Sequence, residues 1–285
     1  MTSTLRALGD QLSEARAAGH AVGAFNVYDL ASMSAVLDAA QDERAAVILA
    51  VGERYVSLLP PAVAAAMARA LAAGRDELPR PGLHLDHAQD PATCRDAIAA
   101  GFTSVMFDGS DLPFEENVHR TRGVVDEAHQ AGVAVEGELG GLAAGDHTDE
   151  GGGDEVLTDP DQAAEFVART GVDALAVSVG TVHGMYRGEP FIDLERLAAI
   201  ADRTSVPLVL HGGSGVPAPL LREAIARGVA KVNVNTEVSL AAIAQIAELL
   251  ERRPTAHLSE LSVAARTAMT PVVADYVRRF RGEQR

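Results

Sequence analysis

Two histidines and two aspartates lie close together in the stretch GLHLDHAQD, residues 82–90. The whole chain has only 9 histidines, so the spacing of His84, Asp86 and His87 raises a question of chemistry. Imidazole and carboxylate groups at such spacing bind metal ions or transfer protons. A single histidine at a strand end is more often a hydrogen-bonded structural residue, so the rest of the chain must decide between these roles.

Further polar residues end five later apolar runs of the chain. They are Asp108, Ser110, Glu136, Glu138, His183, His211, Asn233, Asn235 and Thr236. Three histidines, His87, His183 and His211, thus end three different runs. Three such ligands with one open position are what a catalytic metal ion requires. The pattern predicts a metal centre if the fold brings these ends together.

The elements that must position these residues alternate along the chain. Apolar, β-rich runs occupy 20–27, 45–52, 82–87, 104–109, 133–140, 174–181, 206–213 and 231–236. Helical segments occupy 61–74, 91–100, 115–131, 160–170, 193–203, 217–227 and 237–252. Such alternation favours a parallel sheet covered by helices on both faces. A doubly wound sheet would carry a glycine fingerprint after its first strand, where this chain has AFNVYDL.

We therefore predict an α/β fold, a (β/α)8 TIM barrel, with an additional C-terminal helix over 257–280. No linker divides the sequence, so a single domain over 1–285 is expected. Barrel enzymes assemble their sites at the carboxyl ends of the strands. The three histidines would then share one rim with Asp86 and the carboxylates of the fourth and fifth strands.

The charge of the chain limits its partners. Acidic residues outnumber basic ones, 40 to 24, which gives a formal net charge of −16. This charge repels nucleic acids and anionic lipid, so neither nucleic acid nor membrane is expected as a partner and the ligand is a small molecule. The single cysteine, Cys94, fits a reducing compartment. Because no apolar stretch is long enough for a signal peptide or a membrane span, a cytoplasmic location is expected.

Glycines near the last two strands suggest an anion site. HGGSG contains Gly212, Gly213 and Ser214, and NVNT spans 233–236, each directly before a helix. Backbone N–H groups converge there, at the place where barrels often bind phosphate. A metal beside a phosphate site and carboxylates indicates carbon–carbon chemistry on a phosphorylated ketone. The metal would polarise the carbonyl and stabilise an enediolate while carboxylates move protons.

Seven blocks of the sequence resemble the class II, metal-dependent fructose-bisphosphate and tagatose-bisphosphate aldolases. In family order they are AVGAFNVYDL, LHLDHAQD, DGSDLPFEENV, VEGELGGL, LAVSVGTVHGMY, PLVLHGGSGVP and KVNVNTEV. The resemblance spans nearly the whole chain. It implies a lyase of carbohydrate metabolism, such as glycolysis, that reversibly cleaves a ketose bisphosphate to dihydroxyacetone phosphate and an aldehyde.

The resemblance also implies roles for individual residues. His87, His183 and His211 match zinc ligands, Glu138 matches a carboxylate near the zinc, and Asp86 matches the proton donor to the aldehyde oxygen. The implied substrate contacts are Asn26, Ser110, Gly184, Gly212, Gly213, Ser214, Asn233, Val234, Asn235 and Thr236. His84, on the alternate face from His87, is interpreted as structural. One Zn²⁺ per subunit, a monovalent cation and a homodimer or homotetramer are further implications.

Two departures from the family pattern leave alternatives open. The family's glutamate base, eight residues after Glu138, is replaced by Asp146, so either Asp146 or Glu150 is the base. Ser239 stands where the family carries a cation for the second phosphate. Asn235 matches neither the Asp of fructose-specific members nor the Ala of tagatose-specific ones.

The substrate is therefore either a bisphosphate or a singly phosphorylated ketose with an unphosphorylated aldehyde partner. A catalytically silent metal-binding homologue is the other alternative. A Schiff-base aldolase is disfavoured, because Lys231, the only lysine, is expected at the start of its strand, on the opposite rim.

Overall fold

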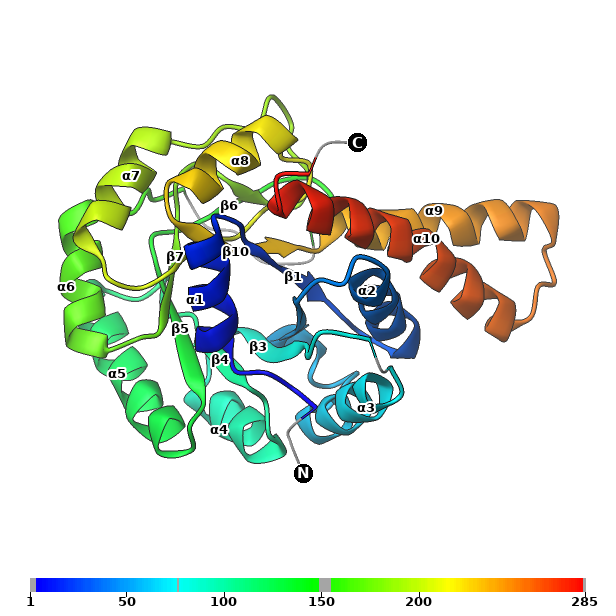
Figure 1. Ribbon diagram of the computed structural model, residues 1–285, viewed down its shortest axis with the longest axis horizontal. Helices are drawn as coiled ribbons and strands as arrows, with labels where there is room; N and C mark the ends of the chain where they lie inside the picture. Colours follow the sequence, from blue (N-terminus) through cyan, green and yellow to red (C-terminus); the bar gives the residue numbers. More distant parts are fainter. Residues whose placement is uncertain (1–3, 76, 149–154, 284–285) are drawn as a thin grey trace.

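The computed structural model describes residues 4–75, 77–148 and 155–283. Within these residues, eight parallel strands close a barrel in the order β1-β10-β9-β7-β5-β4-β3-β2 (Figure 1). They are β1 (Val22–Asn26), β2 (Val47–Gly52), β3 (Gly82–Ala88), β4 (Ser104–Phe107), β5 (Ala134–Leu139), β7 (Ala174–Val177), β9 (Leu208–Leu210) and β10 (Val229–Val234). Each predicted run overlaps one of these strands, and the predicted barrel is confirmed.

Helices surround the barrel as expected, except that α1 lies at one of its ends. They are α1 (Leu8–Ala18), α2 (Leu30–Asp42), α3 (Pro61–Ala73), α4 (Pro91–Ala100), α5 (Phe114–Gln130), α6 (Pro160–Thr170), α7 (Leu194–Arg203), α8 (Ala218–Ala226), α9 (Thr236–Arg252) and α10 (Leu258–Phe280). The last confirms the predicted C-terminal helix. Several starts follow from the sequence: in α4, Asp90 accepts a hydrogen bond from the N–H of Ala92, while Pro91 fixes the first turn.

Some elements lie outside the predicted segments. They are α1, α2, the short 3₁₀ helix η1 (Glu53–Tyr55) and the two-residue strands β6 (Ala143–Ala144) and β8 (Val182–His183), which pair with each other. The short elements lie in loops that follow the carboxyl ends of barrel strands. α1 has a different role, because it packs into the opposite end of the barrel.

The barrel interior is apolar at its amino-terminal end. α1 lies across this end of the barrel (Figure 1), and its residues Leu8, Leu12 and Ala15 are buried there. They pack with the inward-facing residues Val22, Ala24, Ile48, Met106, Ala174, Ala176, Val209 and Ala230. The side chain of Gln11 donates to the carbonyl groups of Val47 and Arg80. α1 therefore closes this end of the barrel, and the opposite end is left for chemistry.

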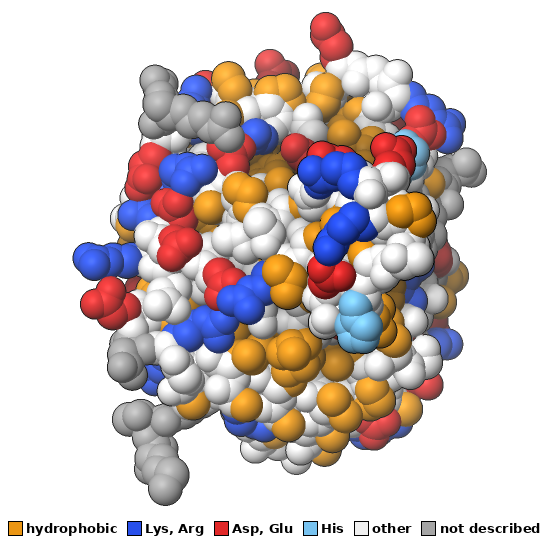
Figure 2. All heavy atoms as spheres, turned by 90° about the vertical axis from the view of Figure 1, so that its right-hand side faces the viewer, with side chains coloured by type: hydrophobic (Ala, Val, Ile, Leu, Met, Phe, Trp, Pro, Cys, Tyr) orange, Lys and Arg blue, Asp and Glu red, His pale blue; other side chains and the backbone are white. Residues whose placement is uncertain are grey.

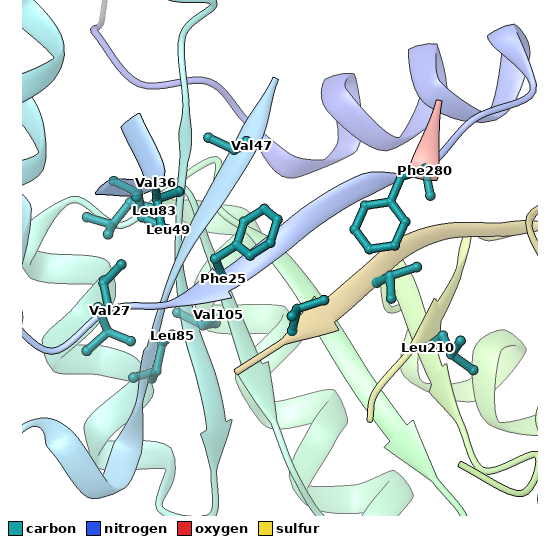
Figure 3. Close-up of a cluster of buried hydrophobic side chains, with 14 of the residues drawn as sticks. Phe25, Val27, Val36, Val47, Leu49, Leu83, Leu85, Val105, Leu210 and Phe280 are labelled. Atoms are coloured by element: carbon teal, nitrogen blue, oxygen red, sulfur yellow. The ribbon is translucent and has the colours of Figure 1, made fainter. Parts of the chain in front are cut away.

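A second apolar layer lies between the sheet and the helices. Figure 3 shows part of it, with Phe25 of β1 close to Phe280 at the end of α10. Gly23 makes this packing possible, because a Cβ atom there would lie 2.5 Å from the ring of Phe25 and 3.1 Å from that of Phe280. The barrel strands are thus held from outside by helices that include α10.

α9 and α10 form an arm that projects to one side of the barrel (Figure 1). The last turns of α10 return to the barrel, where Tyr276 and Phe280 are buried. Further out, Ile243, Leu258 and Val263 are 58%, 73% and 64% exposed. Figure 2, which looks at this side of the molecule, shows apolar side chains between charged ones. Among the described helices, none combines the length and apolar character needed to cross a membrane.

Candidate active site

Three imidazoles meet at the carboxyl-terminal rim of the barrel. His87 lies on β3, His183 on β8 and His211 directly after β9. One ring nitrogen of each lies within 4.8 Å of one nitrogen of the others. Nε2 of His87 and Nδ1 of His211 are 2.8 Å apart. The structure therefore brings together the three histidines that the sequence analysis singled out.

His87 reaches this position through an irregular strand end. Strict alternation along β3 would place its side chain opposite to that of Asp86. However, the register with β4 shifts between Leu85 and Ala88, and His87 has a φ of +49°. A left-handed backbone at a non-glycine residue stores strain, which often marks functional sites. This bulge turns the ring of His87 toward the rim.

Two carboxylates surround His87. Its Nδ1 lies 2.9 Å from Oδ2 of Asp108 and 3.5 Å from Oε2 of Glu138. Burial lowers the pKa of His87, but the hydrogen bond to Asp108 and the charges of Asp86 and Glu138 outweigh it and raise this pKa well above the usual value. Burial and the charge of Asp108 raise the pKa of Glu138. The carboxylates thus crowd a site that needs positive charge.

The donor set fits a divalent metal ion. His87, Asp108 and Glu138 form a second group of potential ligand atoms within 4.8 Å of one another, sharing His87 with the three histidines. Imidazole nitrogens with carboxylate oxygens are ligands of zinc and neighbouring transition metals. Glu138 and Asp108 are therefore available either as ligands or as groups that orient His87.

Asp86 lies beside the histidines with a fixed orientation. Its two carboxylate oxygens accept hydrogen bonds from the side-chain amides of Asn26 and Asn233, each at 3.0 Å. Burial raises its pKa, but the charges of His87, His211 and Lys231 outweigh burial and hold that pKa far below the usual range. The group is thus a buried, ionised carboxylate whose orientation is fixed by two hydrogen bonds.

Behind the rim, the barrel interior holds further polar groups. Nε2 of His211 lies 2.9 Å from Oε1 of Glu136, whose Oε2 accepts a hydrogen bond from Lys231 at 2.7 Å. The expected position of Lys231 was wrong: β10 begins two residues earlier, at Val229, so Lys231 lies inside the barrel instead of at its opposite rim. His84 is fully buried beside them, with Nδ1 2.8 Å from Oγ of Ser104.

Glycines shape a narrow pocket next to the histidines. Gly184 and Gly212 have φ values of +100° and +69°, which favour glycine. A Cβ atom at Gly212 would lie 2.2 Å from the carbonyl oxygen of Val182. The pocket is lined by Asn26, His183, Gly184, His211, Gly212, Ser214, Asn233, Asn235 and Thr236. Seven of the ten predicted substrate contacts are among these residues.

The remaining predicted contacts lie elsewhere. Gly213 is next to the pocket, where its N–H donates to the carbonyl of Asn233. Val234 is 1% exposed and belongs to the apolar layer outside the barrel. Ser110 donates a hydrogen bond to Asp108 and lines a second, larger cavity.

This larger cavity, of about 460 Å³, opens from the histidines toward η1. Its lining residues are Gly52, Glu53, Arg54, Tyr55, Asp86, His87, Gln89, Asp108, Ser110, Asp111, Glu138, Gly141, Leu142 and His183. Among the described residues of this wall, Arg54 is the only lysine or arginine. The residues of η1 were not predicted, although ERY directly follows the expected strand 45–52, which is a detectable signal.

Asp146, the predicted base, lies outside both sets of lining residues. Its carboxylate pairs with Nε of Arg187 at 2.8 Å, and its side chain is 51% exposed. Its backbone pairs with that of Met185, next to Gly184 of the narrow pocket. Glu150, the other candidate, lies outside the described residues.

Comparisons with known proteins agree with this geometry. A model of the family "Fructose-bisphosphate aldolase class-II" matches residues 6–285. A fructose-bisphosphate aldolase from Geobacillus stearothermophilus is 42% identical over 254 residues, 88% of each chain. One from Staphylococcus aureus is 41% identical over 249 residues, 86% of each chain. The crystal structure of the YdjI aldolase from Escherichia coli K12 superposes with a TM-score of 0.85 at 32% identity, over 97% of each chain.

Proposed function

Because the chain belongs to the metal-dependent class II fructose-bisphosphate aldolase family, and is thus an aldolase, a carbon–carbon lyase, we propose that it reversibly cleaves a phosphorylated ketose to dihydroxyacetone phosphate and an aldehyde. One observation carries this proposal. The three histidine nitrogens, within 4.8 Å of one another, lie directly beside the glycine-lined pocket, and His183 and His211 line both the metal position and that pocket.

His87, His183 and His211 are proposed to hold one Zn²⁺ per subunit, with Glu138 as a further ligand or an orienting group. When bound, such an ion polarises a carbonyl oxygen and stabilises negative charge on it. Asp86 is the proposed proton carrier. In cleavage its carboxylate takes the proton of the ketose hydroxyl next to the breaking bond, and in condensation it returns that proton to the aldehyde oxygen.

The narrow pocket is the proposed site for the phosphate of the ketone half. Gly184, Gly212 and Ser214 line it without bulky side chains, and the residues 233–236 lead into the amino terminus of α9. Helix amino termini favour anions through their unpaired N–H groups and the helix dipole. A monovalent cation, as the family resemblance implies, would add positive charge here.

Two substrate classes differ in the part of the ketose that becomes the aldehyde product. A ketose bisphosphate is the first candidate, with Arg54 as the cation that lines the larger cavity. The second candidate is a singly phosphorylated ketose with an uncharged aldehyde part. Two observations favour it: Glu53, Asp86, Asp108, Asp111 and Glu138 line the same cavity, and Ser239 supplies no positive charge.

Asp146 is proposed as the base that removes a proton from the ketone half, with Glu150 as the alternative. The backbone of Asp146 pairs with that of Met185, next to Gly184 of the narrow pocket, and this closeness supports the assignment. Solvent-deuterium exchange into dihydroxyacetone phosphate, without aldehyde, measures this step alone. Asp146→Ala should abolish most exchange and Asp146→Glu should retain much of it; normal exchange in Asp146→Ala would move the base to Glu150 or to a carboxylate nearer the metal.

The proposed assembly is a single-domain chain, residues 1–285, in a cytoplasmic homodimer or homotetramer with no nucleic-acid or membrane partner. The arm supports association, because Ile243, Leu258 and Val263 are exposed apolar residues on projecting helices. Light scattering of Leu258→Glu beside the parent would show whether the arm is used. An unchanged mass would place the interface elsewhere.

A panel of ketose monophosphates and bisphosphates, assayed for release of dihydroxyacetone phosphate, tests the function directly. We expect release from at least one ketose, dependent on a divalent ion. No release from any of them by the metal-loaded protein would favour a catalytically silent homologue.

A further inference from the structure

A short chain of hydrogen bonds connects the only lysine of the sequence to a rim histidine. Nζ of Lys231 donates to Oε2 of Glu136 at 2.7 Å, and Oε1 of Glu136 lies 2.9 Å from Nε2 of His211. Lys231 and Glu136 are 0% exposed and His211 is 1% exposed. The chain crosses the barrel interior, because β5 and β10 are not neighbours in the sheet.

Burying two charges costs several kcal/mol per ion before their attraction offsets it. Lys231 offsets this cost for Glu136 directly, because its Nζ lies 2.7 Å from Oε2 of Glu136 and both residues are 0% exposed. The imidazole of His84 lies further away, with Nε2 3.7 Å from the same carboxylate oxygen. Lys231 is therefore the charge partner of Glu136.

The hydrogen bonds settle which nitrogen of His211 carries the proton. An ionised carboxylate only accepts hydrogen bonds, so Nε2 of His211 must be the donor to Glu136. Nδ1 is then left with a lone pair. This atom points to the other histidines, 2.8 Å from Nε2 of His87, and receives a further contact from the amide of Asn233 at 3.3 Å.

We infer that Lys231 and Glu136 are positioning residues for the metal ion, which hold His211 in the one tautomer that offers Nδ1 as a ligand. Lys231 occupies one oxygen of Glu136 and thereby fixes the other as the acceptor for His211. Partners of this kind orient metal-binding histidines and set their tautomer. The inference rests on the proposed assignment of His211 as a metal ligand.

A purely structural role for the pair makes a different prediction. Replacing a buried ion pair by apolar residues of similar size often leaves stability unchanged or raises it. The double variant Glu136→Met/Lys231→Met should therefore fold, while its metal site loses the partner of His211. The nearly isosteric Glu136→Gln is the second variant. Ser104→Ala is the matched control, because it removes a buried hydrogen bond to His84 in the same interior and leaves the chain to His211 intact.

Zn²⁺ affinity is measured by competition with a chelator, without substrate, and thermal unfolding is measured on the metal-free proteins. We expect both Glu136 variants to bind Zn²⁺ about 10–100-fold more weakly than the parent, and Ser104→Ala to bind as the parent does. Parent affinity in Glu136→Gln would overturn the inference. So would a loss of affinity in Ser104→Ala equal to that of the Glu136 variants, because the effect would then be general damage to the interior.

The tautomer itself is visible in ¹⁵N NMR spectra of the histidine rings. In the metal-free parent, His211 should be protonated at Nε2, and Glu136→Gln should shift this population toward Nδ1. An unchanged tautomer in both Glu136 variants would contradict the proposed mechanism. These measurements need no ketose, so a protein that cleaves no ketose yet shows both effects would refute only the proposed function.

Discussion

The two ends of the barrel interior are built from the same eight strands but have opposite chemistry. At the amino-terminal end, apolar side chains pack against Leu8, Leu12 and Ala15 of α1. At the carboxyl-terminal end, the interior holds the buried polar residues His84, Asp86, Glu136, Glu138, Lys231, His211 and Asn233. At the first end, α1 covers the barrel interior and excludes water. At the second end, a network of ion pairs and hydrogen bonds offsets the cost of burying charged groups.

The same eight strands therefore stabilise the fold at one end and support catalysis at the other. Burial of apolar surface contributes about 25 cal/mol per Å², so the plugged end stabilises the barrel. Buried charges contribute little to stability on balance, so the rim is maintained for its chemistry. Variants at the two ends should therefore fail in different assays.

The largest effect is expected at the rim, from Asp86→Ala. Loss of a positioned proton carrier should lower the rate of ketose cleavage about 10²–10⁴-fold. Metal content should remain that of the parent, because Asp86 lies beside the histidines and bonds to Asn26 and Asn233. Steady-state kinetics with metal analysis measure both. Asp202→Ala, which removes an exposed carboxylate of α7, is the control; cleavage at the parent rate in Asp86→Ala would remove its assigned role.

The opposite end should respond in stability alone. Leu12 is 0% exposed inside the plug, so Leu12→Ala leaves a cavity and should lower the free energy of unfolding by about 2–5 kcal/mol. The turnover of the folded fraction should stay unchanged. Chemical denaturation and kinetics at low temperature test this, with Leu58→Ala, at a residue that is 68% exposed, as a control expected to change stability by less than about 0.5 kcal/mol. A large loss of turnover would show that the two ends are coupled.

Gly212→Ala should give an intermediate effect at the phosphate pocket. The added Cβ would clash with the carbonyl oxygen of Val182, and the backbone has a φ of +69°, which disfavours alanine. We therefore expect the local geometry of the pocket to be less favourable by about 1–3 kcal/mol. This cost should appear mainly as weaker binding of dihydroxyacetone phosphate, measurable by calorimetry. Gly188→Ala is the control, because nothing lies within 4 Å of a Cβ placed there. Equal binding by both variants would argue against this pocket as the phosphate site.

The smallest effect is expected outside the barrel, at Asp38 of α2. Asp38 pairs with Arg75 of α3 at 2.8 Å and with Arg266 of α10 at 2.6 Å. Burial raises its pKa, but the hydrogen bonds to Arg266 and Arg75 outweigh burial and lower it. These partly exposed pairs are screened by solvent, so Asp38→Asn should cost only about 0.5–1 kcal/mol near neutral pH.

The sign of the pH dependence follows from the lowered pKa of Asp38. Its contribution is present above the unfolded pKa of about 3.9 and disappears as the pH falls through the lower folded value. The stability difference between Asp38→Asn and the parent should therefore shrink in acid. A difference that grew in acid would mean that another group is responsible.

The barrel could be predicted because buried parallel strands appear as nearly continuous apolar runs separated by helices. α1 could not, because LGDQLSEARAA contains Gly9 and several charges, and only its position in the barrel end gives it a buried face. The expected start of the last strand was two residues late, and this error alone placed Lys231 at the wrong rim.

The site, like the fold, could be predicted from the sequence only in part. His87, His183 and His211 could be predicted to meet, because strand ends of a barrel share one rim. The turn of His87 toward its partners could not, since it depends on a bulge that breaks the alternation along β3. The hydrogen bonds of Asp86 and His211 join strands far apart in the sequence, and no local pattern reports such contacts.

Metal content measured together with activity tests the central claim most directly. The protein is stripped with a chelator, and Zn²⁺ is then added back in steps while bound metal and release of dihydroxyacetone phosphate are both followed. We predict no cleavage without metal, a rise in rate that parallels binding, and saturation at about one ion per chain. The variant His211→Ala should neither bind the ion tightly nor regain activity. Full activity in a sample shown to be metal-free would contradict the account.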